Sequence, residues 1–345
     1  MRWIINLVAV VVLAVLMNGC AREEVAKYSP NVQFVGYYEG EIYDTYVEDD
    51  YAYLASRDKG LLILDVSEPD SPQEVGYYIA GDIARAVYVQ GDYAYLLTDT
   101  GLPSNWNSRL HVIDVSDPSR PREVGEQYIG GSAVDDIYVS GNYVYIGSGQ
   151  LHIYDVSDPA EPMRVKVLDL NGGVTGIDLL NDYAFCSTIT FAEQGKLVVV
   201  DVADPSAAVT VSTYAGGYPY AYAFGVAVQG DYAYVARDNG LQIVDISIPS
   251  SPNEVGYYLM YRYPLSLSAV HVSGDYAYVT YCTTGLEIID VSDPSNPSQA
   301  GYYELHSQDI GKLYVKDEYI YVTSLYGLDI FRFTAASSPM GKILF

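Results

Sequence analysis

The stretch LLILDVSEPDSPQEVGYY, residues 61–78, decides the fold of this chain. It contains an apolar strand, a turn with two prolines, and a second strand that ends in two tyrosines. Close copies of the same hairpin occupy residues 110–128, 241–258 and 286–303. Proline has a fixed φ and no N–H, and the Asp and Ser side chains favour a tight turn, so the middle segment cannot continue a strand. The chain is therefore built from a repeated β-hairpin.

A second repeated phrase gives the number of units. Segments of the type Asp-Tyr-Ala-Tyr recur seven times, and successive copies lie between 40 and 50 residues apart. Their first tyrosines are Tyr51, Tyr93, Tyr143, Tyr183, Tyr232, Tyr276 and Tyr319. A repeat of this length fits one four-stranded propeller blade. The sequence predicts an all-β fold, a seven-bladed β-propeller of four-stranded antiparallel blades.

Each period contains four short strands. In the second unit they are predicted at residues 84–89, 93–98, 110–115 and 123–128. A Gly-Asp hairpin turn joins the first two strands, and the proline turn joins the last two. The third strand reads LLILDV, LHVIDV or LQIVDI, and it is apolar on both faces. This pattern is typical of a sheet packed between two neighbouring sheets.

The segment LQIVDISIPSSPNEVGYY, residues 241–258, and its copies resemble the LVIVD repeat family of bacterial and archaeal surface proteins. The resemblance covers about residues 34–333 and implies a β-propeller. It implies no particular activity, because one fold hosts many unrelated functions.

The two ends of the chain predict how the ring closes. The last unit stops after its third strand, at residues 328–333, and the missing fourth strand occurs upstream as QFVGYY, residues 33–38. If these two strands pair, no free edge remains. The propeller is predicted to span 33–333, after a linker at 21–32 and before a tail at 334–345. Arg332 stands where the other third strands carry aspartate, since no turn follows it.

The first twenty residues, MRWIINLVAVVVLAVLMNGC, predict a secretory signal peptide. They carry one basic residue and an apolar run that is too short to span a membrane. The end of this segment resembles the lipobox of bacterial lipoproteins, which implies lipid attachment at Cys20. The alternative is an ordinary signal peptide that is cut nearby. We expect a secreted protein, periplasmic or at the cell surface, with the lipid as its one membrane contact.

Composition excludes several classes of partner. The chain has 44 acidic and 18 basic residues, a formal net charge of −26, so it repels nucleic acid and anionic lipid. Cys186 and Cys282 are expected to be free thiols. The four histidines are scattered and are expected at the surface or the rim, and no metal or other cofactor is predicted. A monomer is expected.

The seven copies can be compared with one another to separate scaffold from site. The turn aspartates and the tyrosines recur in almost every unit, so they are assigned to the scaffold. The loops between second and third strands, and between blades, vary in length and lie on one face by propeller connectivity. Loops longer than the scaffold requires are usually where binding occurs.

Aromatic residues and one arginine in these loops are the candidate binding residues. They are Trp106, Tyr218, Tyr220, Tyr222, Tyr261, Arg262 and Tyr263. Such residue types are enriched at binding hot spots, although a chain with 37 tyrosines also places them in loops without a function. The leading hypothesis is a non-enzymatic binding or scaffold protein that recognises a protein, peptide or glycan at the cell envelope.

A second group of candidates lies where the innermost strands reach the central channel. Asp44, Asp135 and Asp136, with Arg85, are candidates for binding a cation or a polar ligand at the channel mouth. Paired carboxylates also perform acid–base catalysis. The alternative hypothesis is therefore a polysaccharide lyase or hydrolase that uses these residues.

Overall fold

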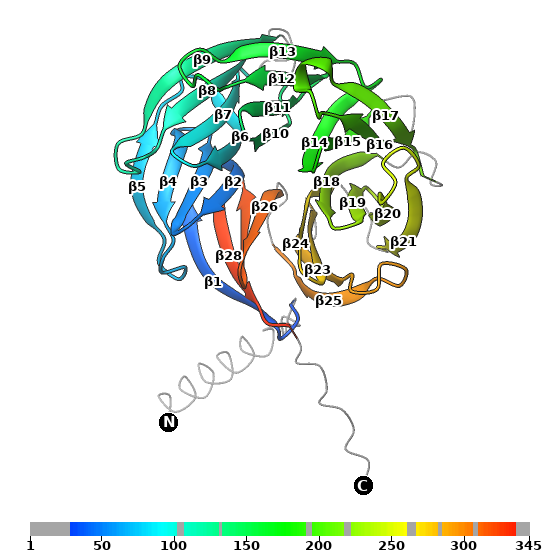
Figure 1. The fold of residues 1–345 in the computed structure, drawn as a ribbon. Coiled ribbons are helices and arrows are strands. Elements are labelled where there is room, and N and C mark those ends of the chain that lie inside the picture. Colours follow the sequence, from blue (N-terminus) through cyan, green and yellow to red (C-terminus); the bar gives the residue numbers. More distant parts are fainter. Residues whose placement is uncertain are drawn as a thin grey trace, which may run out of the picture.

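The computed structural model describes residues 28–101, 107–130, 133–190, 195–216, 222–260, 267–281, 285–305 and 310–335. In these residues seven four-stranded antiparallel sheets stand around a central axis, as the blades of a propeller (Figure 1). The predicted fold class is confirmed. The predicted signal peptide and most of the predicted linker and tail lie outside the described residues.

The strands run outward in chain order through blades 1 to 6, whereas in blade 7 the outermost strand is β1. Blade 1 contains β2 (Ile42–Glu48), β3 (Tyr51–Ser56), β4 (Gly60–Asp65) and β5 (Gln73–Tyr78); blade 2, β6 (Ile83–Gln90), β7 (Tyr93–Asp99), β8 (Ser108–Asp114) and β9 (Arg122–Gly130); blade 3, β10 (Asp136–Ser140), β11 (Tyr143–Gly147), β12 (Leu151–Asp155) and β13 (Met163–Leu168); blade 4, β14 (Gly173–Leu180), β15 (Tyr183–Ile189), β16 (Lys196–Asp201) and β17 (Val209–Tyr214); blade 5, β18 (Ala223–Gln229), β19 (Tyr232–Arg237), β20 (Gly240–Asp245) and β21 (Asn253–Leu259); blade 6, β22 (Leu267–Ser273), β23 (Tyr276–Tyr281), β24 (Gly285–Asp290) and β25 (Ser298–Tyr303); blade 7, β26 (Ile310–Lys316), β27 (Tyr319–Ser324), β28 (Gly327–Phe333) and β1 (Val32–Glu39).

The only helical element in the described residues is a 3₁₀ turn, Pro205–Ala207, in the loop before β17. No helix in this part of the chain is long and apolar enough to cross a membrane. The third strands are mostly buried, and Leu61 to Leu64 are the first example. Burial on both faces explains the continuous apolar runs of these strands.

The N-terminal strand closes the ring. β1 pairs antiparallel with β28, so that Gln33 faces Arg332 and Tyr38 faces Leu328. Within blade 7, Arg332 pairs with Tyr319. Asp65 pairs with Tyr51 in the same way in blade 1. The predicted closure is confirmed, and blade 7 combines strands from both ends of the chain.

A close contact between neighbouring blades explains the glycine of the VGYY phrase. A Cβ on Gly76 would lie 2.3 Å from the carbonyl oxygen of Pro118, in the proline turn of the next blade. On Gly256 the distance to the Pro294 oxygen would be 1.9 Å. Gly36 and Gly125 meet the turns of blades 1 and 3 in the same way. Each of these turns packs very close to the neighbouring strand. Only glycine fits at the contact, because it has no Cβ.

The contact has a different form at the seam of the ring. Blade 7 lacks a proline turn, and Gly301 of blade 6 instead approaches the side chains of Val32, Ser29 and Asn31. The Ser29 amide donates a hydrogen bond to the Tyr302 carbonyl over 2.9 Å. The N-terminal segment therefore supplies both the missing turn contact and the missing strand.

The second tyrosine of the phrase provides a polar link between blades. The Tyr38 hydroxyl donates to the Glu74 carboxylate over 2.7 Å, from blade 7 to blade 1. The Tyr258 hydroxyl donates to Glu287 over 2.8 Å, from blade 5 to blade 6. The recurrent tyrosine thus joins one blade to the next.

The turn aspartates have the scaffold role that their recurrence predicts. Asp65 accepts hydrogen bonds from the Ser67 backbone and hydroxyl over 2.9 and 2.6 Å. Equivalent bonds are made by Asp114, Asp155, Asp201, Asp245 and Asp290. These bonds fix the turns.

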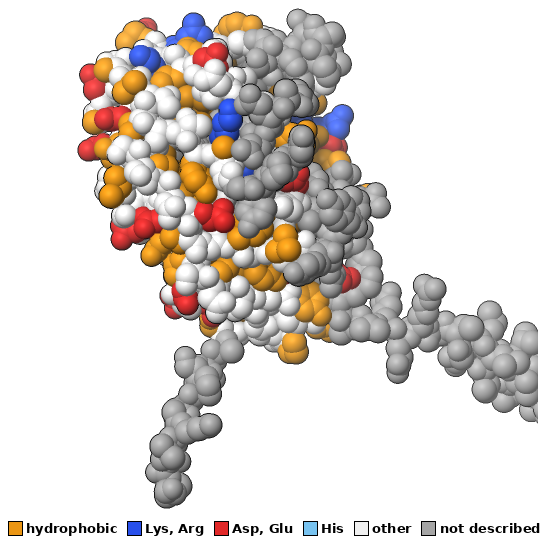
Figure 2. All heavy atoms as spheres, turned by 90° about the vertical axis from the view of Figure 1, so that its right-hand side faces the viewer, with side chains coloured by type: hydrophobic (Ala, Val, Ile, Leu, Met, Phe, Trp, Pro, Cys, Tyr) orange, Lys and Arg blue, Asp and Glu red, His pale blue; other side chains and the backbone are white. Residues whose placement is uncertain are grey.

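The face that carries the Gly-Asp and proline turns is strongly acidic. Figure 2 shows acidic side chains along the left-hand border of the ring in side view. The exposed turn aspartates are Asp49, Asp50, Asp92, Asp117, Asp158, Asp182, Asp204, Asp231, Asp275, Asp293 and Asp317. This face therefore repels anionic surfaces.

The glycine contact predicts a specific loss of stability. Gly256→Ala forces a methyl group against the Pro294 oxygen, so we expect the free energy of unfolding to fall by about 1–3 kcal/mol. Gly130→Ala is the matched control, because its Cβ meets no described atom within 4 Å, and a change below about 0.5 kcal/mol is expected. Denaturant unfolding measures the free energy of unfolding of both variants. Equal losses would show that the close contact between the turn and the glycine does not contribute to stability.

Ring closure predicts a larger effect. Deletion of residues 33–38 leaves most of the β28 edge unpaired and removes five of the seven β1 positions that pair with it. Because a backbone hydrogen bond contributes about 1 kcal/mol net, we expect a loss of roughly 5 kcal/mol or more. A thermal unfolding curve that does not move would show that the ring closes in another way.

Candidate functional site

The innermost strands surround a central cavity of about 370 Å³. Strand periodicity places two layers of equivalent side chains around it. The first layer comprises Asp44, Ala86, Asp136, Gly176, Gly225, Ala269 and Lys312, and the second comprises Tyr46, Tyr88, Tyr138, Asp178, Ala227, His271 and Tyr314. The polar groups of the channel belong to these layers.

Two carboxylates of the first layer bridge neighbouring blades. Asp44 accepts a hydrogen bond from the Val87 amide of blade 2 over 3.0 Å. Asp136 accepts one from the Ile177 amide of blade 4 over 2.7 Å. Burial raises the pKa of Asp44 to about 6, against the favourable charge of Lys312. These carboxylates hold the inner strands together at the axis.

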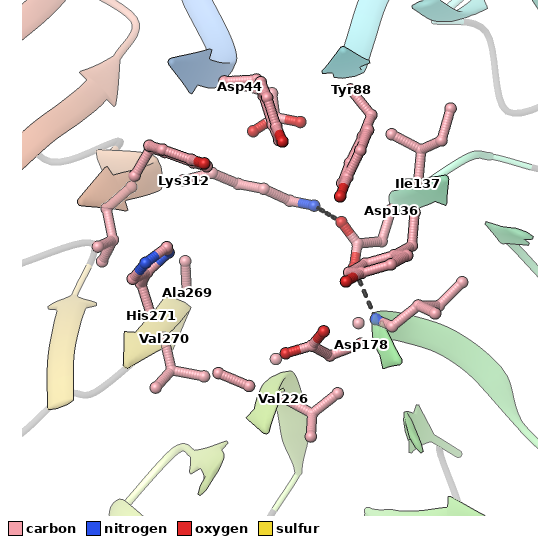
Figure 3. A pocket seen from close by; sticks show the side chains of 18 of the residues that line it. Asp44, Tyr88, Asp136, Ile137, Asp178, Val226, Ala269, Val270, His271 and Lys312 are labelled. Atoms are coloured by element: carbon pink, nitrogen blue, oxygen red, sulfur yellow. Dashed lines mark hydrogen bonds and ion pairs between the residues drawn. The ribbon is translucent and has the colours of Figure 1, made fainter. Parts of the chain in front are cut away.

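Lys312 crosses the channel. It belongs to blade 7, and its ammonium forms an ion pair with Asp136 of blade 3, as Figure 3 shows. Burial alone lowers the pKa of Lys312, but the carboxylates of Asp136 and Asp44 outweigh it and leave the pKa above its ordinary value. The side chain is therefore a permanent cation in the channel. Sequence reasoning did not select it, because a single lysine in one inner strand carries no motif.

Four tyrosines of the second layer form a continuous belt on one side of the cavity. Ring centroids are 4.8 Å apart between Tyr314 and Tyr46, 4.5 Å between Tyr46 and Tyr88, and 5.1 Å between Tyr88 and Tyr138. Their hydroxyl groups act on one another's pKa in series, and the hydroxyl of Tyr138 interacts with the carboxylate of Asp178. The belt joins blades 7, 1, 2 and 3 to a carboxylate of blade 4.

Asp178 continues the belt and was also missed in the sequence. It accepts hydrogen bonds from the amides of Leu179 and Val228, each over 2.7 Å. Burial, with a smaller contribution from the charge of Asp136, raises the pKa of Asp178 to about 7. The carboxyl group therefore titrates close to neutral pH.

The three histidines that the structure describes do not lie at the surface or the rim as expected. His111 and His152 are buried, because their position in the third strand faces the adjacent blade. His271 lines the channel wall beside Tyr314, and burial lowers its pKa to about 4, so the ring is neutral at pH 7. His306 lies outside the described residues. Within those residues no cluster of three metal-ligating side chains occurs.

His111 takes part in an arrangement that resembles a catalytic triad in its contacts. Its Nε2 lies 3.0 Å from the Thr98 hydroxyl, and its Nδ1 lies 2.7 Å from the Glu123 carboxylate. Thr98 is fully buried, so its hydroxyl cannot reach a substrate. The three residues form a polar link across three strands of blade 2.

Of the residues predicted at the channel mouth, Arg85 forms its ion pair with Asp99, outside the predicted set. Arg85 makes a two-point ion pair with Asp99, with distances of 3.1 and 3.2 Å, and its guanidinium lies 4.8 Å from the centre of the Tyr43 ring. Asp135 reaches solvent at the mouth. Desolvation by the surrounding protein raises the pKa of Asp135 to about 6, against the favourable charge of Lys312. Asp99 was missed because the other blades have no equivalent acid there.

Tyr222 is the one residue of the predicted aromatic face that the structure describes. Trp106, Tyr218, Tyr220, Tyr261, Arg262 and Tyr263, together with Cys20, lie outside the described residues. Tyr222 is described, just before β18, with its ring edge-on to that of Phe224 at 6.1 Å. The Tyr222 carbonyl accepts a hydrogen bond from the Asp238 amide over 3.4 Å, which ties this loop to the turn after β19.

A buried arginine that the sequence did not reveal holds the loops of this face at their bases. Arg237 is fully buried at the end of β19. It donates to the carbonyls of Gly195 and Ala215 over 3.0 and 3.4 Å, and to the Gln242 side chain over 2.8 Å. Gly195 and Ala215 border the long loops of blade 4. Burial lowers the pKa of Arg237, although the group remains a cation.

These features define a closed repeat propeller with a polar channel and one variable face. The LVIVD repeat matches residues 39–80, 81–127, 130–169, 171–216, 221–260 and 267–304. The chain belongs to the LVIVD repeat family. The seventh blade falls outside the six matches, since its fourth strand comes from the other end of the chain. No curated protein matches the sequence.

Solved structures share the fold at low sequence identity. The β-propeller domain of Cps50 (Swd1) from Myceliophteria thermophila is 13% identical, with a TM-score of 0.69 over 88% of this chain and all of that one. BamB from Moraxella catarrhalis is 13% identical, with a TM-score of 0.58 over 92% of this chain and 96% of that one. The computationally designed Ika8 protein is 9% identical, with a TM-score of 0.59 over 88% of this chain and its own full length. These similarities show the fold alone.

The channel predicts an unusual pH dependence of stability. The folded-state pKa of Asp178, about 7, exceeds its ordinary value of 3.8, so its contribution to stability is full below pH 4 and is lost as the pH rises through 7. This group lowers the free energy of unfolding by up to about 1.4 kcal/mol per pH unit in that window. Asp178→Asn cannot titrate, so we expect a smaller decline of stability between pH 5 and 7.5.

Asp117→Asn is the control for this experiment. Asp117 is exposed in a turn, and the Ser119 hydroxyl holds its pKa below the ordinary value, so its effect is confined to more acidic solutions. Denaturant unfolding at several pH values gives the slope for each variant. If Asp178→Asn keeps the wild-type slope, the carboxyl group is not protonated in the folded protein.

Proposed function

We propose that the protein is a non-enzymatic binding or scaffold protein that recognises a protein, peptide or glycan through the face opposite the acidic turns. The observation that carries this proposal is the contrast between the two faces of the ring. The turns of the acidic face repeat almost unchanged. On the other face the connection from Asp99 to Ser108 is much longer than its counterpart from Ser324 to Gly327. Variation confined to one face is typical of a recognition surface on a rigid scaffold.

Buried charges at the bases of these loops support the proposal. Arg237 binds carbonyls at the borders of two loops of blade 4, and Asp99 accepts a hydrogen bond from the Gly101 amide over 2.7 Å while it pairs with Arg85. Loops that are held before a ligand arrives lose less conformational entropy on binding. Such buried polar anchors are not needed to close the propeller, since blade 7 has the short connection.

The residue types of the loops define the proposed contacts. Trp106, Tyr218, Tyr220 and Arg262 combine apolar area with hydrogen-bonding groups, as binding hot spots do. Sugar rings also stack on such side chains. The signal peptide and the lipid on Cys20 would place this face at the cell envelope, and both are part of the proposal.

The catalytic alternative depends on the channel mouth. Asp44 and Asp136 are engaged by backbone amides of neighbouring blades, and Asp136 also pairs with Lys312. These bonds favour a structural role. A polysaccharide lyase or hydrolase would then rely on Asp135, the carboxylate at the mouth that reaches solvent. Asp135→Asn therefore separates the hypotheses, since it abolishes catalysis and leaves recognition by the loops unchanged.

The test is an affinity capture from envelope extract and a parallel glycan array, both with the full chain. We expect Tyr220→Ala/Arg262→Ala to lose the captured protein or glycan by at least about tenfold, because hot-spot residues contribute 2 kcal/mol or more each. Arg120→Ala/Met163→Ala, two exposed residues at the proline turns, is the matched control and should retain the ligand.

The outcome locates the binding face. Loss in the control variant alone would move recognition to the acidic face and overturn the proposal. Equal retention in both variants would remove the aromatic loops from recognition.

A further inference from the structure

The central cavity is lined unevenly around the ring. Blades 4, 5 and 6 contribute Gly176, Gly225 and Ala269 to its first layer, and Ala227 to the second. Asp44, Asp136 and Lys312 come from the other blades, whereas Asp178 of blade 4 adjoins the small side chains. In Figure 3 Ala269, Val226 and Val270 lie on one side, and Asp44 and Asp136 point in from the other. The open volume therefore lies between a wall of small side chains and a set of polar groups.

The charges in this cavity do not balance. Three carboxylates, those of Asp44, Asp136 and Asp178, face the single ammonium of Lys312, which is paired with Asp136. His271 is neutral at pH 7, so it adds no positive charge. Each carboxylate oxygen that accepts a backbone amide retains a further lone pair. The site attracts cations and repels anions.

The remaining lining favours an organic cation over a metal ion. The belt of Tyr314, Tyr46, Tyr88 and Tyr138 presents aromatic rings and hydroxyl oxygens, and both attract an ammonium group. Metal ions require several ligands that converge on one point, and within the described residues no such cluster occurs. A volume of about 370 Å³ is suited to a molecule of several heavy atoms.

Lys312 shows how an ammonium is bound in this environment. Its own Nζ reaches a carboxylate of the first layer from across the channel (Figure 3). We propose that the cavity is a binding site for a small organic cation, a primary amine or a short diamine, whose ammonium groups bind Asp44 and Asp178 beside the tyrosine belt. The site is independent of the loops of the variable face.

The test is titration calorimetry of the full chain with 1,4-diaminobutane at low ionic strength and pH 8. The uncharged 1,4-butanediol, which has the same length, is the matched control ligand. We expect saturable 1:1 binding of the diamine and none of the diol. No heat of binding with the diamine, or equal heats with the diol, would overturn the proposal.

Two variants locate the amine in the cavity. Ala227→Leu fills the small-residue side and leaves every carboxylate in place, so we expect at least about tenfold weaker binding. Lys312→Met removes the resident ammonium and frees Asp136, so we expect about tenfold tighter binding of the diamine. If Lys312 only stabilised the fold, its replacement would not strengthen binding of the diamine. Thermal unfolding with and without diamine provides a second readout, because a ligand of the folded state raises Tm.

A surface control completes the experiment, since any acidic protein attracts amines. Asp117→Asn removes an exposed turn carboxylate far from the channel and should leave the affinity unchanged. If it weakens binding as much as Ala227→Leu does, the amine binds the acidic face and the cavity site is wrong. If Ala227→Leu binds like the wild type, the proposal is equally overturned.

Discussion

The ring depends on the insertion of the proline turns against the outer strand of the preceding blade, and the turns of blades 1, 2, 3 and 6 meet a glycine there. At Gly256 the turn oxygen comes so close that no side chain is possible. A blade on its own buries neither face, so its stability comes from these contacts with both neighbours. The seam of the ring is the exception, because blade 7 has no proline turn and the contact is made by another segment. There, residues 29–32 take the place of the absent turn, and the same segment continues as β1 to complete blade 7.

Closure of the ring brings aspartates into two opposite electrostatic environments. In the turns, the hydroxyl and amide of Ser67 hold the pKa of Asp65 below its ordinary value. At the axis, burial raises the pKa of Asp178 to about 7 although two amides also bind it. The difference lies in desolvation, which the exposed turns do not impose. Aspartate therefore contributes negative charge to the face with the turns and a titratable carboxyl group to the channel.

The departures from the repeat are where specific function can be sought. Arg237, Arg85 and Asp99 occur in single blades, and each fixes the base of a loop on the variable face. Lys312 likewise occurs in one inner strand, and it changes the channel from a set of blade bridges into a cavity with a resident ammonium. A seven-fold scaffold can tolerate such single changes, because the remaining blades retain the contacts that close the ring.

By itself, the sequence determined the blade count, the strand order and the closure of the ring by the N-terminal strand. Each of these follows from local signals: a hairpin of fixed length, turn residues with restricted backbones, and a third strand that is apolar on both faces. It also separated the recurrent turn aspartates from candidate sites, because seven copies could be compared.

Only the tertiary structure decided which side chains meet. Lys312 and Asp136 are far apart in the chain, and their ion pair depends on the width of the ring and on the direction of each inner strand. Arg85 is close in sequence to the channel residues yet pairs with Asp99, since a bulge between Ala84 and Ala86 interrupts the pairing of its strand. His111 is buried because of a neighbouring blade, which no local pattern reveals. Such contacts arise between blades, where position in the ring rather than distance along the chain determines which groups are neighbours.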